Sequence, residues 1–416
     1  MKIRKNLEKG SATMIVIFVI FFIVIILSTF LVYVTSKRNN QLMETEKLSE
    51  IYNGDMQEIY EERKNRENRI EAEIEKEDMN KVENVTSEDG VVVPIPKGYV
   101  PSTVNGEKSV NTGFVIKEGN DGSLTEGINE FVWVPVQEIS DIYDEEHKAG
   151  QLWDFSGETS TKKLYPPEKN SGYREPDVIT EGQVGNDSAM GGYYDTLPSN
   201  LKEAGFDINN MNNDLNQDNK IDAKDFKINL QKEFDNMIES VKKYKGFYIG
   251  RYQTGDLSKE KAVVQKNNSD INYQNWYRMY KVNKTVGANE NVETSMIWGC
   301  QWDATLRWMQ TSDNPEVRKF PTDSRGKGSY WEAHAGKAIP TGSNSAYAVN
   351  NIYDMGGNVE DWTLEAHGIY LRILRGGHYN YRGNDFPASI RNHYAPIGNL
   401  DTGGTRTALY IAIGKK

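Results

Sequence analysis

The sequence has almost no cysteine, because Cys300 is the only one among 416 residues. This excludes an intramolecular disulfide and a zinc site built from several thiolates. An excess of basic residues is also missing: 49 Lys and Arg stand against 60 Asp and Glu, which gives a net charge of −11. No basic surface dominates such a chain, so the composition argues against a nucleic-acid partner.

Charge is missing altogether from residues 11–36, and the centre of this run, Met14–Val34, is strongly apolar. About 20 apolar residues suffice to cross a bilayer. The basic flank stands on the N-terminal side, which places residues 1–10 in the cytoplasm and the rest of the chain outside. We therefore expect a transmembrane helix over residues 11–36 that holds an extracellular domain on a bacterial cell surface. A cleaved secretory signal is the alternative, but the run is long for one and no small-x-small cleavage site follows it.

The basic leader ends at Gly10, and Ser11 opens the apolar run. This arrangement resembles a type IV prepilin leader, which is cut after such a glycine. Pilins usually carry a glutamate at the fifth mature position, where this chain has Ile15. The resemblance is thus closer to minor, pilin-like proteins, and it implies other pilin-like subunits as partners.

Residues 37–88 are rich in Glu, Lys, Arg and Asn and have one weak apolar stripe. Its members recur mostly at spacings of three and four: Leu48, Tyr52, Met56, Ile59, Ile70 and Ile74. This spacing predicts a charged helical stalk that continues from the membrane span. Arg63 and Arg66 fall where a coiled coil needs apolar residues, and Gly54 interrupts the stripe. These residues favour a solvated spacer helix over a coiled coil.

From Val91 onward, aromatic residues, glycines and turn residues replace the helical stripe, which predicts a domain over residues 91–416. Three of its first segments have the composition of short strands: Val91–Ile95, Gly113–Lys117 and Asn129–Val136. Residues 137–205 carry many turn signals and predict no particular element.

The segment Asp214–Asp225, DLNQDNKIDAKD, has the spacing of an EF-hand calcium loop. Five side-chain oxygens and one backbone carbonyl are the expected ligands, from Asp214, Asn216, Asp218, Lys220, Asp222 and Asp225. Ile221 is the apolar residue that ties such loops to a core. Asn219 replaces the usual glycine and has to adopt a left-handed turn. A polar surface loop without an ion is the alternative, because the preceding run is rich in asparagine.

After this loop, apolar residues recur at spacings of four and three: Phe226, Leu230, Phe234, Ile238 and Val241. The spacing predicts an amphipathic helix over Ala223–Tyr244 with one buried face. The calcium loop and the helix together form an insertion over residues 206–245.

The stretch Asn350–Thr363, NNIYDMGGNVEDWT, places two glycines among the acids Asp354, Glu360 and Asp361. It predicts a loop folded around an ion, since glycine lets backbone carbonyls approach closely. A hairpin loop with a buried Trp362 is the alternative.

This stretch resembles the GLYDMxGNVWEWT signature of the formylglycine-generating-enzyme (sulfatase-modifying factor) family. Further segments match that family in its own order: NEFVWVPV (129–136), GFYIGRYQT (246–254), the helix-opening segment with Trp302 and Asp303, LRGGHY (374–379), Arg391 and GTRTAL (404–409). Several matches in order are more specific than any one of them. The resemblance implies an α+β, C-type-lectin-like, loop-rich fold.

The resemblance also implies a structural calcium ion. The matching ligand positions are Asp354, Gly357, Val359 and Asp361. The family's Trp-Glu pair is replaced here by Glu360 and Asp361, so the acid is one carbon shorter. Such an ion orders a loop and is not catalytic.

The family's oxidase activity requires a copper-binding cysteine pair just after LRGGSW, and this chain has no cysteine there. The related sulfoxide synthases bind iron through histidines of an additional helical domain. The five histidines here show no HxxxH spacing: His147, His334, His367, His378 and His393. An enzyme is therefore disfavoured. A metal-dependent oxidase or sulfoxide synthase remains the alternative, and so does a metal held between His378 and His393.

Adaptable polar and aromatic side chains cluster between the matched segments near the C-terminus. The candidate ligand-binding residues are His378, Tyr379, Asn380, Tyr381, Asn384, Asn392, His393 and Tyr394. Tyr, His and Asn are typical of adaptable binding surfaces. This pattern resembles the variable lectin-like proteins diversified by retroelements, although drift in exposed loops would give the same composition. We expect a membrane-anchored, calcium-ordered, non-catalytic domain that binds a glycan, a peptide or a phage, with a structural minor pilin as a further alternative.

Overall fold

The computed structural model describes residues 27–29, 31–38, 64, 81–123, 127–155, 162–164, 173–174, 197–207, 209–219, 221–334, 336–367 and 371–414. Two units make up the chain, Met1–Glu75 with Lys416 and Lys76–Lys415. In the first unit, residues 27–29 and 31–38 are helical. No helix among the described residues is long and apolar enough to span a membrane. Most of the expected span and of the charged stalk lies outside the described residues.

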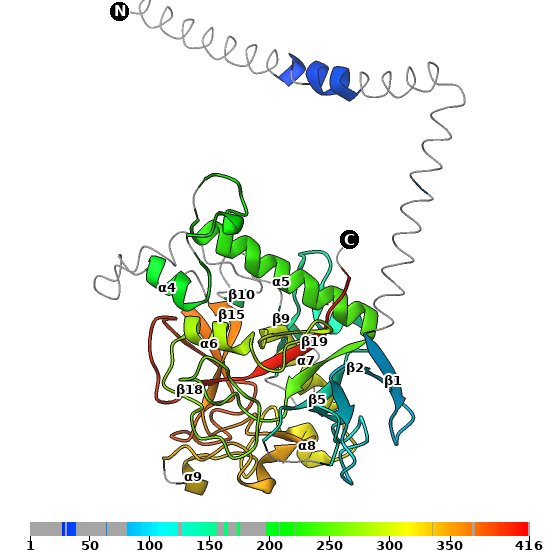
Figure 1. Ribbon diagram of the computed structural model, residues 1–416, viewed down its shortest axis with the longest axis vertical. Helices are drawn as coiled ribbons and strands as arrows, with labels where there is room; N and C mark the ends of the chain where they lie inside the picture. The colour runs from blue at the N-terminus through cyan, green and yellow to red at the C-terminus, as the bar shows by residue number, and fades with distance from the viewer. Residues whose placement is uncertain are drawn as a thin grey trace, which may run out of the picture. The chain divides into compact units, whose positions relative to one another are not determined.

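The larger unit is built on a six-stranded antiparallel sheet (Figure 1). Its order is β12 (Val292–Met296), β19 (Thr407–Ile411), β11 (Gly246–Gly250), β5 (Glu130–Pro135), β4 (Val115–Glu118) and β3 (Tyr99–Pro101). The central strands read as apolar runs with every or nearly every side chain buried, as expected for strands covered on both faces. The C-terminal strand β19 thus lies between strands from the middle of the chain.

Helix α5 (Ala223–Tyr244) packs on β11 and β19, as Figure 1 shows, and it has the bounds that the apolar spacing predicts. Its five periodic apolar residues are all buried: Phe226, Leu230, Phe234, Ile238 and Val241. The helix begins with a capping box between Asp222 and Asp225 and ends at Lys245, whose φ of 63° is left-handed.

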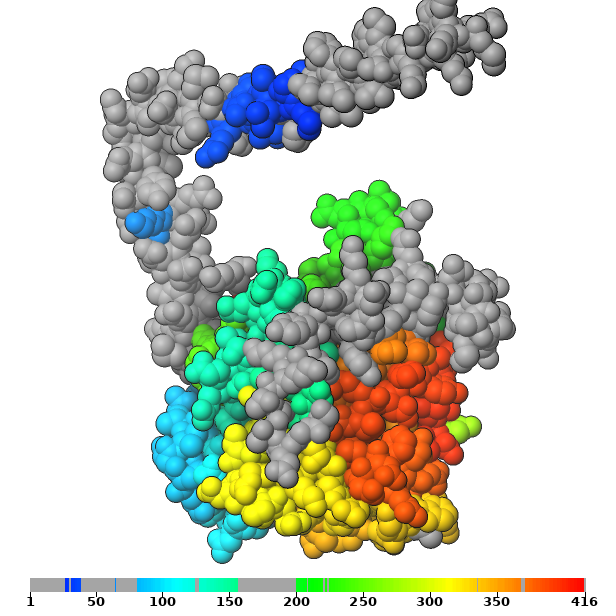
Figure 2. Space-filling model, turned by 180° about the vertical axis from the view of Figure 1, so that it is seen from behind, coloured from blue at the N-terminus to red at the C-terminus, as the bar shows by residue number. Residues whose placement is uncertain are grey.

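A second sheet has the order β10 (Tyr173–Arg174), β15 (Glu360–His367), β16 (Leu371–Arg375) and β17 (Arg391–Tyr394), and β18 (Gly403–Thr405) pairs in parallel with β15. Helices α6 (Trp276–Asn283) and α7 (Gly299–Gln310) pack near the two sheets, with α7 in contact with β5, β8 and β15. Viewed from behind, the orange and red C-terminal segments lie beside the yellow ones (Figure 2).

The remaining elements are short. The strands are β1 (Val82–Thr86), β2 (Val92–Pro96), β6 (Tyr143–Asp144), β7 (Ala149–Gly150), β8 (Leu152–Asp154), β9 (Lys162–Leu164), β13 (Ala348–Val349) and β14 (Ile352–Tyr353). The helices are α4 (Leu197–Glu203), α8 (Pro315–Lys319) and α9 (Trp331–His334), with 3-10 turns η1 (Ile139–Asp141), η3 (Met211–Asn213) and η4 (Ser345–Tyr347). The unit is therefore an α+β domain rich in loops, as expected.

The three strands predicted from Val91 onward are confirmed within two residues as β2, β4 and β5. The helical interpretation of the stalk up to residue 88 is wrong at its end, because Val82–Thr86 forms strand β1. This strand pairs antiparallel with β2, with Val85 opposite Val93. Val85 is partly buried against the core, so tertiary pairing overrides the charged composition there.

Candidate functional site

Within the glycine-containing stretch 350–363, residues 354–359 form the loop that joins β14 to β15. Asp354, Gly357 and Asn358 all have positive φ, at 53°, 74° and 61°. A Cβ at Gly357 would lie 2.9 Å from the carbonyl oxygen of Ser329, so glycine is required for space as well as for its backbone angle. Trp362 is fully buried on the strand that follows.

Buried amide side chains hold the inside of this loop. The Nε2 group of Gln253 donates to the carbonyl of Val359 at 2.7 Å and to Oδ1 of Asp361 at 3.0 Å. Asn358 in turn donates through Nδ2 to Oε1 of Gln253 at 2.9 Å. Both amide side chains lie in fully buried residues, so each of these hydrogen bonds satisfies groups that water does not reach.

Arg406, from the matched segment GTRTAL, completes the loop. Its Nε lies 3.2 Å from Oδ2 of Asp361, and its two Nη groups donate to the carbonyls of Gly250, Tyr353 and Asp354 at 2.9 to 3.1 Å. The guanidinium is fully buried. One arginine thus ties the candidate metal loop to the six-stranded sheet.

The loop holds three buried carboxyl groups, and two of them, Asp354 and Asp361, interact with that arginine. Burial raises the pKa of Asp361 to about 6 although Arg406 lowers it, and it raises the pKa of Glu360 to about 7. The pKa of Asp354 is also raised by burial, against hydrogen bonds from Gly342 and Thr341. Desolvation therefore dominates at all three groups.

The expected calcium ligands in this loop were Asp354, Gly357, Val359 and Asp361. Their oxygen atoms are of the kind that calcium prefers. In the structure, however, Gln253 already occupies the Val359 carbonyl and one Asp361 oxygen, and Arg406 occupies the other. A calcium ion here would compete with these two side chains. The described residues include no group of three or more His, Cys, Asp or Glu side chains arranged to hold a metal.

The second candidate loop, Asp214–Asp225, folds around its own carboxylates. Asp214 accepts hydrogen bonds from the backbone N–H groups of Asp218 and Asn219 at 3.1 and 2.9 Å. Asp225 accepts from those of Leu215, Asn216 and Asp222 at 2.7 to 3.1 Å. The two ends of the loop are therefore closed by side-chain acceptors.

Two local expectations for this loop are confirmed. Asn219 has a φ of 66°, the left-handed turn required of the residue that replaces glycine. Ile221 is partly buried against the core. Lys220 lies outside the described residues, and calcium binding by Asp214, Asn216, Asp218, Asp222 and Asp225 stays a prediction.

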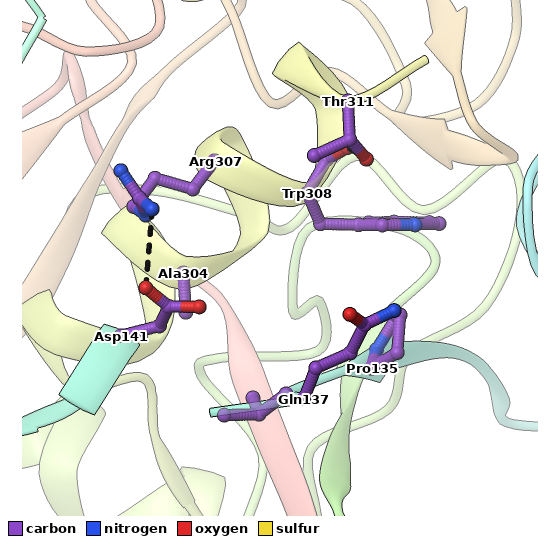
Figure 3. A pocket seen from close by; sticks show the side chains of 8 residues that line it. Pro135, Gln137, Asp141, Ala304, Arg307, Trp308 and Thr311 are labelled. Atoms are coloured by element: carbon purple, nitrogen blue, oxygen red, sulfur yellow. Dashed lines mark hydrogen bonds and ion pairs between the residues drawn. The ribbon is translucent and has the colours of Figure 1, made fainter. Parts of the chain in front are cut away.

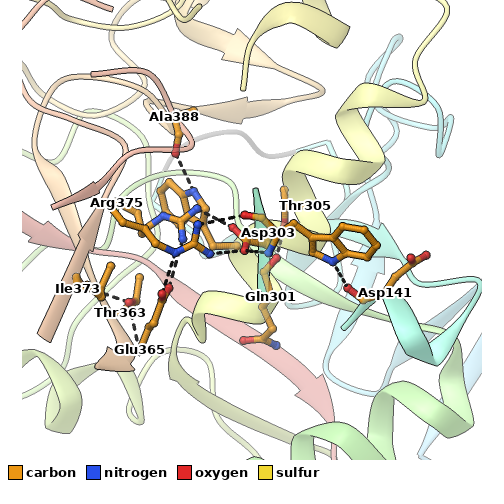
Figure 4. A network of polar contacts seen from close by, with 12 residues as sticks. Asp141, Gln301, Asp303, Thr305, Thr363, Glu365, Ile373, Arg375 and Ala388 are labelled. Carbon is orange, nitrogen blue, oxygen red and sulfur yellow. Dashed lines mark hydrogen bonds and ion pairs between the residues drawn. The ribbon is translucent and has the colours of Figure 1, made fainter. Parts of the chain in front are cut away.

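A closed ring of four buried charges lies between α7 and the second sheet (Figure 4). Arg375 contacts Asp303 at 2.6 Å and Glu365 at 3.2 Å, and Arg391 contacts the same two carboxylates. Asp303 also accepts from the backbone N–H of Trp153 at 2.8 Å. Three of the four residues belong to matched segments, whereas Glu365 was not singled out, since nothing in the run EDWTLEAH marks it as a partner.

The candidate ligand-binding residues divide into two groups. In the first, which follows β16, the rings of His378 and Tyr381 are 4.0 Å apart, and Tyr381 stacks on Phe386 at 3.7 Å. His378 and Tyr379 are buried, although the sequence places both in a binding surface, and burial lowers the pKa of His378 to about 4. Asn380 and Asn384 are exposed.

The second group lies on β17, where successive side chains point to opposite faces. Asn392 donates to both oxygens of Glu360, at 3.0 and 3.3 Å, and so joins the glycine-containing loop. His393 instead stacks on His367, with ring centres 4.6 Å apart. Tyr394 is 43% exposed. The ring partners of His378 and His393 differ, and neither histidine belongs to a metal-binding group among the described residues.

One further aromatic residue borders the first group and was missed from the sequence. Trp331 is 52% exposed, and its backbone N–H donates to the carbonyl of Tyr381 at 3.0 Å. A Cβ at Gly336 would lie 2.9 Å from both the Trp331 ring and the Asn380 side chain, so these two side chains flank the same glycine. We call His378, Tyr379, Asn380, Tyr381, Phe386 and Trp331 the aromatic cluster.

No family model and no curated protein matches the sequence. Solved structures are similar to it, and they include the following three. PvdO from Pseudomonas aeruginosa is 18% identical, with a TM-score of 0.28 over 40% of this chain and 81% of that one. CarF is 11% identical, with a TM-score of 0.30 over 40% and 87% of the two chains. Treponema denticola variable protein 1 is 12% identical, with a TM-score of 0.27 over 70% and 98%.

Identities and TM-scores this low say nothing of what the chain binds or does. The domain resembles the formylglycine-generating-enzyme family in the positions of its own motif residues. Asp303, Arg375 and Arg391 meet in the charge ring, and Asp361 and Arg406 meet in the glycine-containing loop. Segments that match one family in order along the chain therefore also meet in space.

Proposed function

We propose that this chain is a membrane-anchored surface protein whose domain binds a ligand without catalysis, through the aromatic cluster. The ligand is a surface structure of the kind expected from the sequence, namely a glycan, a peptide or a phage. Calcium orders the loop 214–225 and the loop 354–361, and residues 11–36 form the anchor. Other pilin-like subunits are further candidate partners.

The observation that carries the proposal is the rigidity of the aromatic cluster. Tyr381 is held between His378 and Phe386, and its carbonyl is held by Trp331. Exposed Asn380 and half-exposed Trp331 stand at the edge of this packed layer. Rings that are fixed before binding lose little entropy on binding, and short amides beside them supply adaptable hydrogen bonds.

The remaining candidate groups favour binding over chemistry. Cys300 is buried on α7, and burial holds His378 in its neutral form. Asp303 and Glu365 are locked in the charge ring by two arginines. Each of these four groups could otherwise serve as a nucleophile or a general base, and each is buried or held by structural contacts.

The test is binding by the full chain in detergent to a panel of glycans and bacterial cells, with calcium and with chelator. Trp331→Ala and Asn380→Ala change exposed side chains and should lose the binding, whereas Met211→Ala, at an equally exposed apolar residue in the insertion, should keep it. If nothing on the panel binds and the purified protein carries stoichiometric copper or iron, the enzyme alternative replaces this proposal.

A further inference from the structure

A hollow of about 280 Å³ lies between the end of β5 and one face of α7 (Figure 3). The helix contributes Ala304, Arg307 and Trp308, and Thr311 caps its C-terminal end. These residues follow the i, i+3, i+4, i+7 spacing of a single helix face. Pro135, Val136 and Gln137 come from the chain that leaves β5. The walls thus come from the two rigid elements of the domain core.

The indole of Trp308 forms one broad wall of the hollow. Figure 3 shows it edge-on, with Gln137 and Pro135 across the gap from its face. Trp308 is only 8% exposed, so the ring is fixed by its packing. The space between this ring and the opposite wall is therefore bounded on one side by an apolar face, which suits a ligand of one ring with an apolar face of its own.

One end of the hollow is closed by an ion pair. An Nη group of Arg307 lies 3.1 Å from Oδ1 of Asp141, and the guanidinium sits 3.3 Å from the ring centre of Trp153. The indole N–H of Trp153 donates to the carbonyl of Asp141 at 2.8 Å. These contacts hold both charged groups in place before any ligand arrives.

Hydrogen-bonding groups remain for a ligand along the rim. Among the described residues, the amide of Gln137 and the indole N–H of Trp308 have no hydrogen-bond partner. Gln137 is exposed and supplies both a donor and an acceptor. An aromatic and apolar lining with a few convergent polar groups is the usual composition of a small-molecule site.

We propose that this hollow binds a single neutral pyranose ring of a glycan. The C–H face of the sugar would lie against the Trp308 indole, and its hydroxyl groups would reach Gln137, Asp141 and Arg307. The chemistry favours a neutral ligand, because Arg307 and Asp141 neutralise each other and leave no net charge for an ionic group. The volume is close to the lower end of ligand pockets, roughly 300 Å³, so one ring fits and a longer chain would extend into solvent.

A nucleoside is the nearest rival, because a base could also stack on the indole. A nucleotide would bring phosphate charges to a chain of net charge −11, and among the described residues that line the hollow the one cation, Arg307, is paired with Asp141. None of the hollow's lining residues belongs to the aromatic cluster. The sugar site therefore goes beyond the proposed function. Sugar binding in the hollow and ligand binding by the aromatic cluster can each fail without the other.

The test is ligand-detected saturation-transfer NMR and tryptophan fluorescence on the full chain in detergent. The probes are methyl glycosides of glucose, galactose, mannose and N-acetylglucosamine, with adenosine as the rival. A ligand of this size should bind with a dissociation constant on the order of a millimolar. Trp308→Ala should abolish the transfer, and Gln137→Ala, which changes an exposed side chain and leaves folding intact, should weaken binding at least about threefold.

Trp331→Ala is the matched control, because it removes an indole from the aromatic cluster and should leave glycoside binding unchanged. The proposal is overturned if no glycoside binds, if adenosine binds and the glycosides do not, or if Gln137→Ala leaves glycoside affinity unchanged. Loss of glycoside binding in Trp331→Ala together with its survival in Trp308→Ala would overturn it as well, since the sugar would then belong to the aromatic cluster.

Discussion

Arg375 and Asp303 form an ion pair with no exposed surface, in which Nη2 of the arginine lies 2.6 Å from Oδ1 of the aspartate. Glu365 and Arg391 close the pair into a ring with equal numbers of positive and negative charges. Each charge has lost most of its hydration and faces two opposite charges within the ring. The ring is therefore stable as a set, and it holds α7 against the second sheet.

Removing one cation from this ring should be costly. Arg375→Met keeps the apolar volume but leaves two buried carboxylates with Arg391 alone, and we expect a loss of about 3–5 kcal/mol in the free energy of unfolding. Urea unfolding of the variant beside the parent chain measures it. Glu239→Gln, which breaks the exposed pair with Lys242 on α5, is the control and should cost less than about 1 kcal/mol. Equal losses in the two variants would contradict the structural role of the ring.

The sequence could predict features set by local spacing. Helix α5 followed from its apolar period, and the left-handed Asn219 followed from its place in the loop. Asp303, Arg375 and Arg391 were found by family resemblance, but their meeting point was not, since it depends on contacts far apart in sequence. Glu365 illustrates this, because only pairing of β15 with β16 brings it to Arg375.

The errors have the same origin. The charged pattern predicts a helix across β1, because the segment VENVT is short and polar and only pairing with β2 decides its structure. For His378, the composition of its segment predicts a binding surface, but the ring is buried. The hydrogen bond from the N–H of Tyr379 to the carbonyl of Asn358 draws this segment against the glycine-containing loop and helps to bury the ring.

In the loop 214–225, mutation should separate the calcium-binding role of Asp218 from the structural role of Asp225. Asp218→Ala should abolish calcium binding by the loop and leave unfolding in chelator unchanged, because its side chain is exposed to solvent. Asp225→Ala should lower the free energy of unfolding by about 1–3 kcal/mol even in chelator, because three backbone N–H groups lose their acceptor. Isothermal titration with calcium and urea unfolding measure the two effects. Calcium binding unaffected by Asp218→Ala would exclude the loop as the site.

The glycine-containing loop should account for a second calcium ion. Equilibrium dialysis of the parent chain is expected to give two ions per chain, and Asp218→Ala should leave one. Asp361→Asn should remove the second ion. The amide has one oxygen in place of two and carries no charge, whereas the Asp361 carboxylate contacts Arg406 and Gln253 through both oxygens. A single ion that disappears completely in Asp218→Ala would show that Arg406 and Gln253 satisfy this loop without metal.

The neutral, buried state of His378 should make the domain less stable in acid. Burial lowers its pKa from 6.5 to about 4, so between these values the unfolded chain takes up a proton that the folded chain does not. The contribution of the neutral His378 ring to the free energy of unfolding is complete above pH 6.5. It is lost as the pH falls toward 4. After allowance for solvent screening this contribution is on the order of 1–2 kcal/mol.

His378→Phe keeps a ring beside Tyr381 but cannot titrate, so its unfolding free energy should fall less between pH 7 and pH 4.5 than that of the parent chain. Asn380→Ala keeps the histidine and should follow the parent. Parallel pH curves for the parent and His378→Phe would mean that this ring takes up its proton equally well in the folded domain, and the acid sensitivity would then have to come from other groups.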